Sequence, residues 1–122
     1  MANPFCHIEL NSNDPGKAKE FYKDLFDWEY QEWPMEDGEY TVIKTGKDPG
    51  GGIFKNPVPD QAPSHWLIYI EVSDIDSVTS KAAELGATVH KEVMDIPDMG
   101  KFSVLEDPTG AVFALWQPSK KQ

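Results

Sequence analysis

Residues 7–26 read HIELNSNDPGKAKEFYKDLF, and residues 67–86 read LIYIEVSDIDSVTSKAAELG. The two stretches carry one pattern at an offset of 60 residues: an apolar run, an aspartate, and then apolar residues three and four positions apart. The first part is typical of a β-strand and the second of an amphipathic helix. Because order and offset agree, the sequence predicts a chain built from one unit repeated twice.

The ends of the expected helices are marked in both halves. In the first half Asp14 is a typical N-cap, and Pro15 follows at the first helical position. In the second half Asp74 or Asp76 caps the helix, and Gly86 follows its last apolar residue, as glycine often does at a helix C-terminus. We therefore expect one helix in each half, directly after a strand.

Alternating and β-branched runs predict the strands. They lie near residues 5–10, 28–33, 41–44, 52–54, 66–72, 88–93, 102–105 and 111–116, with a tight turn at 107–110 before the last strand. Three prolines in residues 57–63 predict a linker. Residues 1–122 are thus expected to form a single domain, with module one at about 3–57, the Pro-rich linker at about 57–63 and module two at about 64–118.

The charge balance limits the classes of partner. Acidic residues outnumber basic ones 21 to 11, the formal net charge is −10, and all basic residues are lysine. Nucleic acids and anionic membranes both require a positive surface, so neither is expected as a partner. A small-molecule ligand that is neutral or cationic is favoured instead.

The expected cellular compartment follows from sequence features that are missing. No apolar run approaches the roughly 20 residues that span a bilayer, and the N-terminus does not read as a signal peptide. The single cysteine, Cys6, has no partner for an internal disulfide. We therefore expect a cytoplasmic protein.

The duplicated order of elements resembles the vicinal-oxygen-chelate superfamily, which includes glyoxalases, bleomycin-resistance proteins and extradiol dioxygenases. The motifs that carry the resemblance are His7…Asp14…Phe21-Tyr22…Leu25, residues 72–76, residues 84–87, residues 96–102 and residues 107–110. The resemblance implies an α+β fold in which two tandem βαβββ modules form a curled eight-stranded sheet around a cleft, with helices on the outer face. It also implies a homodimer.

The same resemblance implies a divalent metal held by four strand positions. In this chain they are His7, Leu67, Ala114 and Ile53, the last within one residue because the Gly50–Gly52 run blurs the register. One imidazole and three aliphatic groups do not hold a catalytic metal, which needs about three protein ligands. No cofactor is therefore expected.

A displaced metal site is the alternative. Side chains alternate along a strand, so residues of equal parity on the first strands of the two modules share one face. On this basis a displaced metal could use His7, Glu9 and His65, or Glu71 in place of His65.

Parity also defines the expected ligand-binding set. Its members are His7, Glu9, His65, Leu67, Tyr69, Ala114 and Trp116. Within it Trp116 is the best aromatic contact, and His7 and Glu71 are the candidate catalytic bases. His7 and Tyr69 could equally be structural, and Glu9 and Glu71 are expected at the rim of the cleft.

The remaining aromatic and thiol groups have competing interpretations. Trp66 has the opposite parity and is expected to pack under a helix. Trp28 and Trp33 could line the mouth of the cleft or form an exposed interface patch. Cys6 is expected to be a buried, inert thiol.

Three functions stay open on the sequence alone. The first is a metal-free binder of a partly aromatic, neutral or cationic small molecule, similar to bleomycin-resistance proteins. The second is an enzyme: a metal-dependent lyase or dioxygenase with a displaced site, or a metal-free isomerase. The third is an interaction protein in which the repeat serves as a dimer scaffold.

Overall fold

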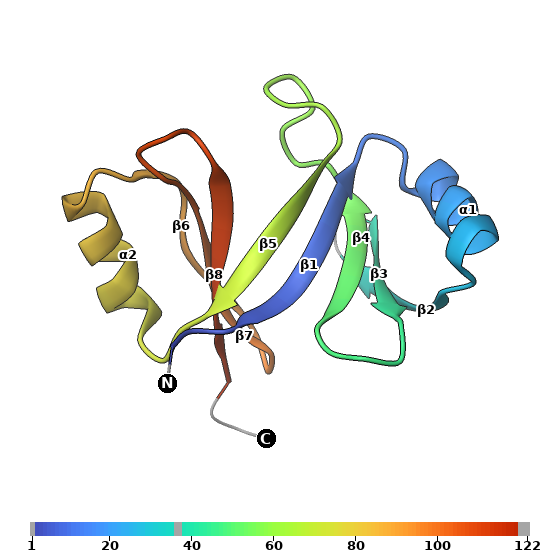
Figure 1. Ribbon diagram of the computed structural model, residues 1–122, viewed down its shortest axis with the longest axis horizontal. Coiled ribbons are helices and arrows are strands. Elements are labelled where there is room, and N and C mark those ends of the chain that lie inside the picture. The colour runs from blue at the N-terminus through green and yellow to red at the C-terminus, as the bar shows by residue number, and fades with distance from the viewer. Residues whose placement is uncertain (1, 36–37, 120–122) are drawn as a thin grey trace. The chain divides into compact units, whose positions relative to one another are not determined.

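The computed structural model describes residues 2–35 and 38–119, which form two helices and eight strands (Figure 1). The elements are β1 (Phe5–Ser12), α1 (Pro15–Phe26), β2 (Glu29–Met35), β3 (Gly38–Lys44), β4 (Gly50–Lys55), β5 (His65–Glu71), α2 (Ile75–Glu84), β6 (Thr88–Ile96), β7 (Gly100–Glu106) and β8 (Val112–Pro118). The strands are hydrogen-bonded in the order β2-β3-β4-β1-β5-β8-β7-β6, a mixed sheet that does not close into a barrel. The expected α+β class and the repeated order of elements are confirmed.

The chain divides into two compact units, each with its own helix. The N-terminal unit is His7–Leu67, and the C-terminal unit combines Met1–Cys6 with Ile68–Gln122. The division cuts through β1 and β5. The single domain and its module boundaries at the Pro-rich linker stay predictions.

In the N-terminal unit, α1 packs on one face of its strands. Asp14 accepts a hydrogen bond from the Lys17 amide at 3.1 Å, which satisfies one of the free N–H groups at the helix start, and Pro15 follows. Leu10, Ile43 and Ile53 form the buried core beneath the helix. The opposite face of these strands carries none of these core residues.

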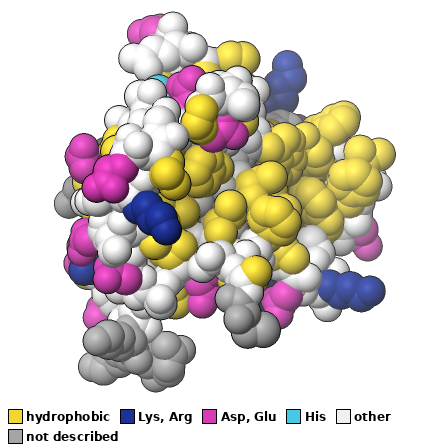
Figure 2. All heavy atoms as spheres, turned by 60° about the vertical axis from the view of Figure 1, so that its left-hand side comes forward, with side chains coloured by type: hydrophobic (Ala, Val, Ile, Leu, Met, Phe, Trp, Pro, Cys, Tyr) yellow, Lys and Arg dark blue, Asp and Glu magenta, His cyan; other side chains and the backbone are white. Residues whose placement is uncertain are grey.

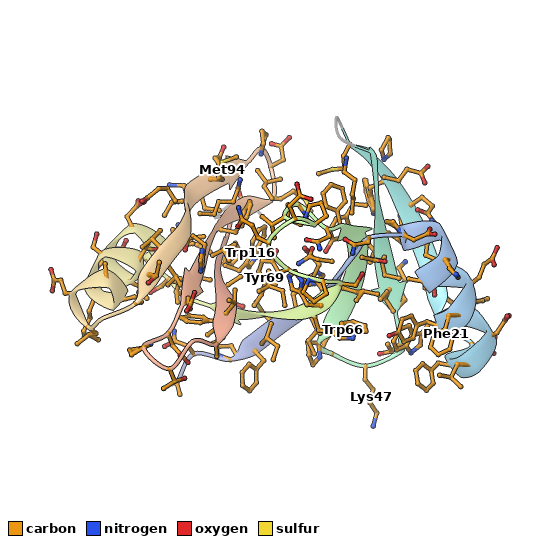
Figure 3. The ribbon with its side chains drawn as sticks, turned by 90° about the horizontal axis from the view of Figure 1, so that it is seen from above. Phe21, Lys47, Trp66, Tyr69, Met94 and Trp116 are labelled. Carbon is orange, nitrogen blue, oxygen red and sulfur yellow. The ribbon has the colours of Figure 1, made fainter. Side chains whose placement is uncertain are left out.

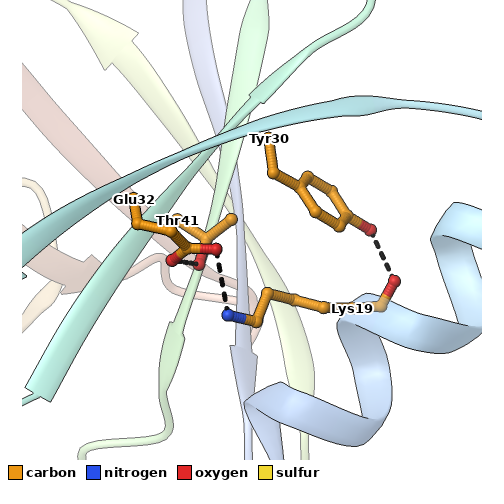
Figure 4. Close-up of polar contacts among 4 residues, drawn as sticks. All are labelled: Lys19, Tyr30, Glu32 and Thr41. Carbon is orange, nitrogen blue, oxygen red and sulfur yellow. Dashed lines mark hydrogen bonds and ion pairs between the residues drawn. The ribbon is translucent and has the colours of Figure 1, made fainter.

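A polar cluster ties α1 to the edge of its strands (Figure 4). Lys19 lies 3.1 Å from Glu32, Thr41 donates to Glu32 at 2.7 Å, and the Tyr30 hydroxyl donates to the Lys19 carbonyl at 2.8 Å. Burial acts to raise the pKa of Glu32, but the hydrogen bonds from Thr41 and Lys19 and the lysine charge outweigh it and lower the pKa. The cluster fastens strand β2 to the helix.

The C-terminal unit repeats the arrangement around α2. Asp74, rather than Asp76, is the N-cap, and its side chain accepts from the Ser77 amide at 3.2 Å. Val72, Ile75, Leu105 and Leu115 form the core against the helix. Strands β5 and β8 are parallel, with Tyr69 paired to Ala114 and Glu71 to Trp116.

Two loops are fixed by side-chain hydrogen bonds. The buried Asn56 side chain donates to Asn13 at 3.0 Å and to the Ala62 carbonyl at 2.9 Å, and it accepts from the Val58 amide at 3.0 Å, which holds the Pro-rich linker. Asp107 accepts from Thr109 and from the Ala111 amide, and these hydrogen bonds lower its pKa. The predicted turn at 107–110 is confirmed.

Candidate functional site

The candidate site lies on the face of the N-terminal unit opposite α1. Leu10 points into the core under the helix, so the alternate residues His7, Glu9 and Asn11 lie on the other face of β1. The parallel partner β4 places Gly52 beside Glu9 and Phe54 beside Asn11. Polar and aromatic groups therefore share a face that also carries glycine.

Two of these polar groups converge on Tyr40 of β3. The Tyr40 hydroxyl lies 2.6 Å from Nε2 of His7 and donates to Oε1 of Glu9 at 2.9 Å. Glu9 is only 8% exposed, which corrects its expected place at the rim of a cleft. A buried carboxylate is stabilised when it accepts hydrogen bonds, and Tyr40 supplies one here.

The ring of Tyr40 is fixed by its neighbours. It stacks on the His7 ring with centroids 6.2 Å apart and an interplanar angle of 27°, and it packs at 5.8 Å against Phe54. A Cβ atom on Gly52 would overlap the Tyr40 hydroxyl group. Tyr40 therefore occupies the space that any side chain at position 52 would need.

The hydrogen-bond directions in this cluster follow from the chemistry of each group. A carboxylate only accepts, so the tyrosine proton points to Glu9, and His7 then donates from Nε2 to the tyrosine oxygen. Burial lowers the pKa of His7, which favours the neutral ring. We call this set, His7, Tyr40 and Glu9, the polar triad.

His65 and Leu67 lie near the start of β5 in the same unit. Nδ1 of His65 lies 2.7 Å from the Pro63 carbonyl, which can only accept, so this nitrogen carries the proton. Its Nε2 contacts the Asn11 side chain at 3.4 Å, and Leu67 is buried.

The side chains at the four family metal positions do not fit a divalent metal. Ile53 packs in the core under α1, so within the expected range of one residue the position falls on Gly52, which shares the face of Glu9. Leu67 and Ala114 have aliphatic side chains without a lone pair, Gly52 has no side chain, and the His7 nitrogen is hydrogen-bonded to Tyr40, so the set falls short of the three protein ligands that a metal needs.

The displaced metal site that the sequence offers as an alternative stays a prediction. Within residues 2–35 and 38–119, no three His, Cys, Asp or Glu side chains are grouped closely enough to hold a metal ion. His7 and Glu9 converge on Tyr40, whereas His65 is held by Pro63 and Asn11.

The remaining predicted site residues belong to the C-terminal unit. Tyr69 and Ala114 are buried register partners, and Glu71 and Trp116 are half-buried partners further along the same strands. Figure 3 shows Tyr69 on β5 and Trp116 on the neighbouring β8. The ring of Trp116 also lies against Gly100, where an added Cβ atom would stand 2.7 Å from it.

The other tryptophans and the cysteine fall on different surfaces. Trp33 is paired with Tyr40 and therefore shares the face of the polar triad. Trp28 stacks on Tyr22 of α1 instead, with centroids 5.6 Å apart. The half-buried Cys6 thiol contacts the Tyr69 carbonyl at 3.6 Å, and burial together with the charge of Glu71 raises its pKa.

An apolar surface surrounds α1, which has no fully buried residue among those described. The large hydrophobic side chains of this surface are Phe21 (58% exposed), Leu25 (57%) and Phe26 (52%) on α1, and Trp66 (42%) on β5. Trp66 touches the helix edge-on through Tyr22 at 5.7 Å, so its predicted packing under a helix is only partly realised. Hydrophobic side chains gather over this part of the surface in Figure 2, and Figure 3 labels Phe21 and Trp66. We call these four residues the α1 apolar face.

Sequence reasoning missed Tyr40, the residue that organises the site. The signal was available, since the alternation of β3 puts Ile43 under the helix and Tyr40 on the opposite face. What the alternation alone does not give is the register that brings Tyr40 over Gly52.

Comparison with known proteins places these observations in context. The profile of the glyoxalase/bleomycin resistance protein/dioxygenase superfamily matches residues 5–115. A "Putative glyoxylase CFP32" from Mycobacterium bovis is 36% identical over 115 residues, which cover 93% of this chain and 44% of that protein. The anthracycline biosynthesis protein DnrV from Streptomyces peucetius is 27% identical over 126 residues, covering 90% of this chain and 45% of the relative. The chain thus spans less than half the length of these curated relatives.

Solved structures agree on the fold. A hypothetical protein, BH1468 from Bacillus halodurans, superposes with a TM-score of 0.78 at 12% identity, over 100% of this chain and 99% of that one. Methylmalonyl-CoA epimerase from Mycobacterium tuberculosis gives a TM-score of 0.72 at 16% identity, over 96% and 89% of the two chains. At these identities the likeness concerns the fold alone.

Proposed function

Since the chain belongs to the glyoxalase/bleomycin resistance protein/dioxygenase superfamily, we propose that it is a member that binds a small molecule on the face of the polar triad without a metal. The observation that carries the proposal is the contact of Tyr40 with both His7 and Glu9. A ligand site typically combines a few polar groups in fixed positions with aromatic side chains.

The chemistry of this face favours ligands that donate hydrogen bonds. Glu9 contributes a carboxylate, and the chain carries a net charge of −10 without an arginine that could clamp an anion. Phe54, Tyr40 and Trp33 offer aromatic surface on the same face. We therefore propose a partly aromatic ligand with an amine or hydroxyl group. The similarity to a protein named for anthracycline biosynthesis supports an aromatic ligand, because anthracyclines contain fused aromatic rings.

The site candidates outside the polar triad remain proposals for ligand contact. In the N-terminal unit they are His65 and Leu67, and in the C-terminal unit they are Tyr69, Ala114 and Trp116. Glu71 and His7 stay candidate bases should the ligand be transformed. A Trp116→Ala variant that binds the ligand as tightly as the unchanged chain would remove Trp116 from the site.

A panel of aromatic amines, phenols and aromatic carboxylic acids tests the proposal, with binding followed by NMR shifts of the His7 ring. We expect amines or phenols to bind and carboxylic acids not to bind. Glu9→Gln and Tyr40→Phe should weaken binding, whereas Glu32→Gln, on the opposite face of the strands, should leave it unchanged (Figure 4). Tightest binding by the carboxylic acids, or binding that ignores Glu9, would contradict the proposal.

A metal-dependent lyase or dioxygenase that uses a displaced site is the second candidate. The 36% identity to a protein named as a putative glyoxylase supports it. Calorimetric titration of metal-stripped protein with Zn²⁺, Ni²⁺, Mn²⁺ and Fe²⁺ separates the two candidates. Tight one-to-one binding that disappears in His7→Ala would favour the lyase or dioxygenase and overturn the metal-free proposal.

We also propose that the chain forms a homodimer through the α1 apolar face. None of its four residues is charged, so a contact between two copies through these side chains has an uncharged centre, although each copy carries a net charge of −10. Across the described residues no helix has the length and apolar character needed to cross a membrane. A cytoplasmic location and the absence of nucleic-acid partners remain predictions.

A further inference from the structure

One of the family's metal positions in the N-terminal unit has no side chain that could bind a metal, and a neighbouring side chain also fills the space above it. At position 52 the chain has glycine, and the space above this glycine is filled by Tyr40 from the adjacent strand. The hydroxyl group of the same tyrosine contacts both neighbouring polar groups, His7 and Glu9. One residue therefore does two things: it fills the site and it pairs the donors that remain there.

We infer that Tyr40 takes the place of a metal ion, holding His7 and Glu9 as one hydrogen-bonded unit and excluding divalent cations from this face. The inference deepens the proposed function, on which it rests, by naming the residue that makes the site metal-free. The site then recognises its ligand through hydrogen bonds and aromatic contact, so it selects alcohols, phenols and amines over compounds that bind by chelating a cation.

The atoms involved explain the exclusion. A histidine nitrogen binds a metal through its lone pair, so a metal at Nε2 of His7 would have to break the hydrogen bond to Tyr40 and shift the ring proton to Nδ1. Oε1 of Glu9 accepts the tyrosine proton. A cation would have to displace both hydrogen bonds and move an aromatic ring that is stacked on His7 and packed against Phe54. The loss of these contacts opposes metal binding even where two donors are near.

The inference predicts that metal binding can be restored by removing Tyr40 and replacing the glycine. Tyr40→Ala removes the hydroxyl group that bonds to His7 and Glu9, and Gly52→Glu adds a third metal donor on the face of Glu9. Three protein ligands are the usual number in an open metal site. The combined Tyr40→Ala/Gly52→Glu variant is the main test, and Tyr30→Phe is the matched control because its hydroxyl bonds to Lys19 on the α1 side.

Calorimetric titration with Ni²⁺ and Zn²⁺, at pH 7 and on protein whose fold is checked by circular dichroism, measures the outcome. We expect the combined variant to bind one Ni²⁺ per chain at least roughly 100-fold more tightly than the unchanged chain, and to lose this affinity when His7→Ala is added. The control should behave as the unchanged chain does. A folded combined variant with no gain in affinity would overturn the inference while leaving the metal-free proposal standing. Tight binding by the unchanged chain would instead overturn the proposed function itself.

Tyr40→Phe covers the case in which the combined variant does not fold. It keeps the ring and removes only the hydroxyl group. We expect ¹⁵N NMR of the unchanged chain to show His7 protonated at Nε2, and the hydrogen-bonded signal of this proton to disappear in Tyr40→Phe. We also expect Ni²⁺ affinity to rise by roughly 10-fold, because His7 and Glu9 no longer bond to a hydroxyl group at position 40. Unchanged His7 signals together with unchanged Ni²⁺ affinity would overturn the inference.

Discussion

Gly52 lies so close to Tyr40 that a Cβ atom on the glycine would overlap the tyrosine hydroxyl group and ring. The overlap involves the whole end of a side chain that is also bonded to His7 and Glu9, so it cannot be relieved by a small rotation. We expect Gly52→Ala to lower the free energy of unfolding by about 1–3 kcal/mol, the usual cost of overpacking. Urea unfolding measures the change.

A rescue experiment assigns that loss to Tyr40. Tyr40→Ala should restore most of the stability in the Gly52→Ala background, whereas Tyr40→Phe should not, because the ring carbons lie within 2.6 Å of the added Cβ atom as well. Gly16→Ala in α1 is the control, since its added atom meets nothing closer than 3.8 Å. Equal losses at positions 16 and 52 would contradict the assignment.

The titration of His7 is expected to be displaced. Burial lowers its pKa, so the ring should take up a proton at a pH below 6.5. Between the lowered pKa of the folded chain and 6.5 the unfolded chain binds the proton more readily. The contribution of His7 to the free energy of unfolding is therefore complete above pH 6.5 and falls as the pH decreases through this window.

NMR titration of the three histidine rings measures the midpoint directly. Urea unfolding at pH 7 and pH 5.5 should show a smaller loss of stability in His7→Gln than in the unchanged chain. A His7 midpoint at or above 6.5 would show that burial does not control this ring.

We expect the hydrogen bonds of the Asn56 side chain to contribute most to holding the Pro-rich linker in place. Its side chain is 2% exposed and bonds to Asn13, Ala62 and Val58, so Asn56→Ala removes three hydrogen bonds that hold the linker to a buried side chain. We expect a loss of about 2 kcal/mol, together with faster proteolysis within residues 57–63. Asn13→Ala removes a single exposed partner and should cost less than about 1 kcal/mol. Similar effects for the two variants would mean that the linker is held in another way.

The α1 apolar face is expected to control association. Phe21→Glu and Phe26→Glu place charges on side chains that are more than half exposed, so the fold should persist while two copies repel one another. Sedimentation velocity should then show a dimer for the unchanged chain and a monomer for either variant. Leu85→Glu, at a 69% exposed position at the end of α2, should not change the mass. A dimer in all three variants would move the interface elsewhere.

The sequence predicted those parts of the structure that depend on near neighbours. Asp14 and Asp74 mark helix starts because a cap contacts amides within the next turn, and the alternation of β1 separates His7 from Leu10 because strand geometry is regular. Both are local rules, so a single sequence is enough to apply them.

The centre of the site could not be predicted in the same way. Tyr40 reaches residues 33 and 31 positions away, and the contact depends on the register of three glycines that the sequence pattern leaves open. The burial of Glu9 follows from that contact and was missed with it. Long-range pairing thus determines the chemistry of the site, even though local patterns determine its scaffold.

The mutual exclusion between Tyr40 and any side chain at position 52 also constrains how the sequence can change over generations. A glutamate introduced first at position 52 meets the tyrosine, and loss of the tyrosine first leaves His7 and Glu9 without the group that joins them. Each single step is unfavourable, although the two together are compatible. A return to metal binding by successive single substitutions therefore passes through a less stable chain, whichever of the two residues changes first.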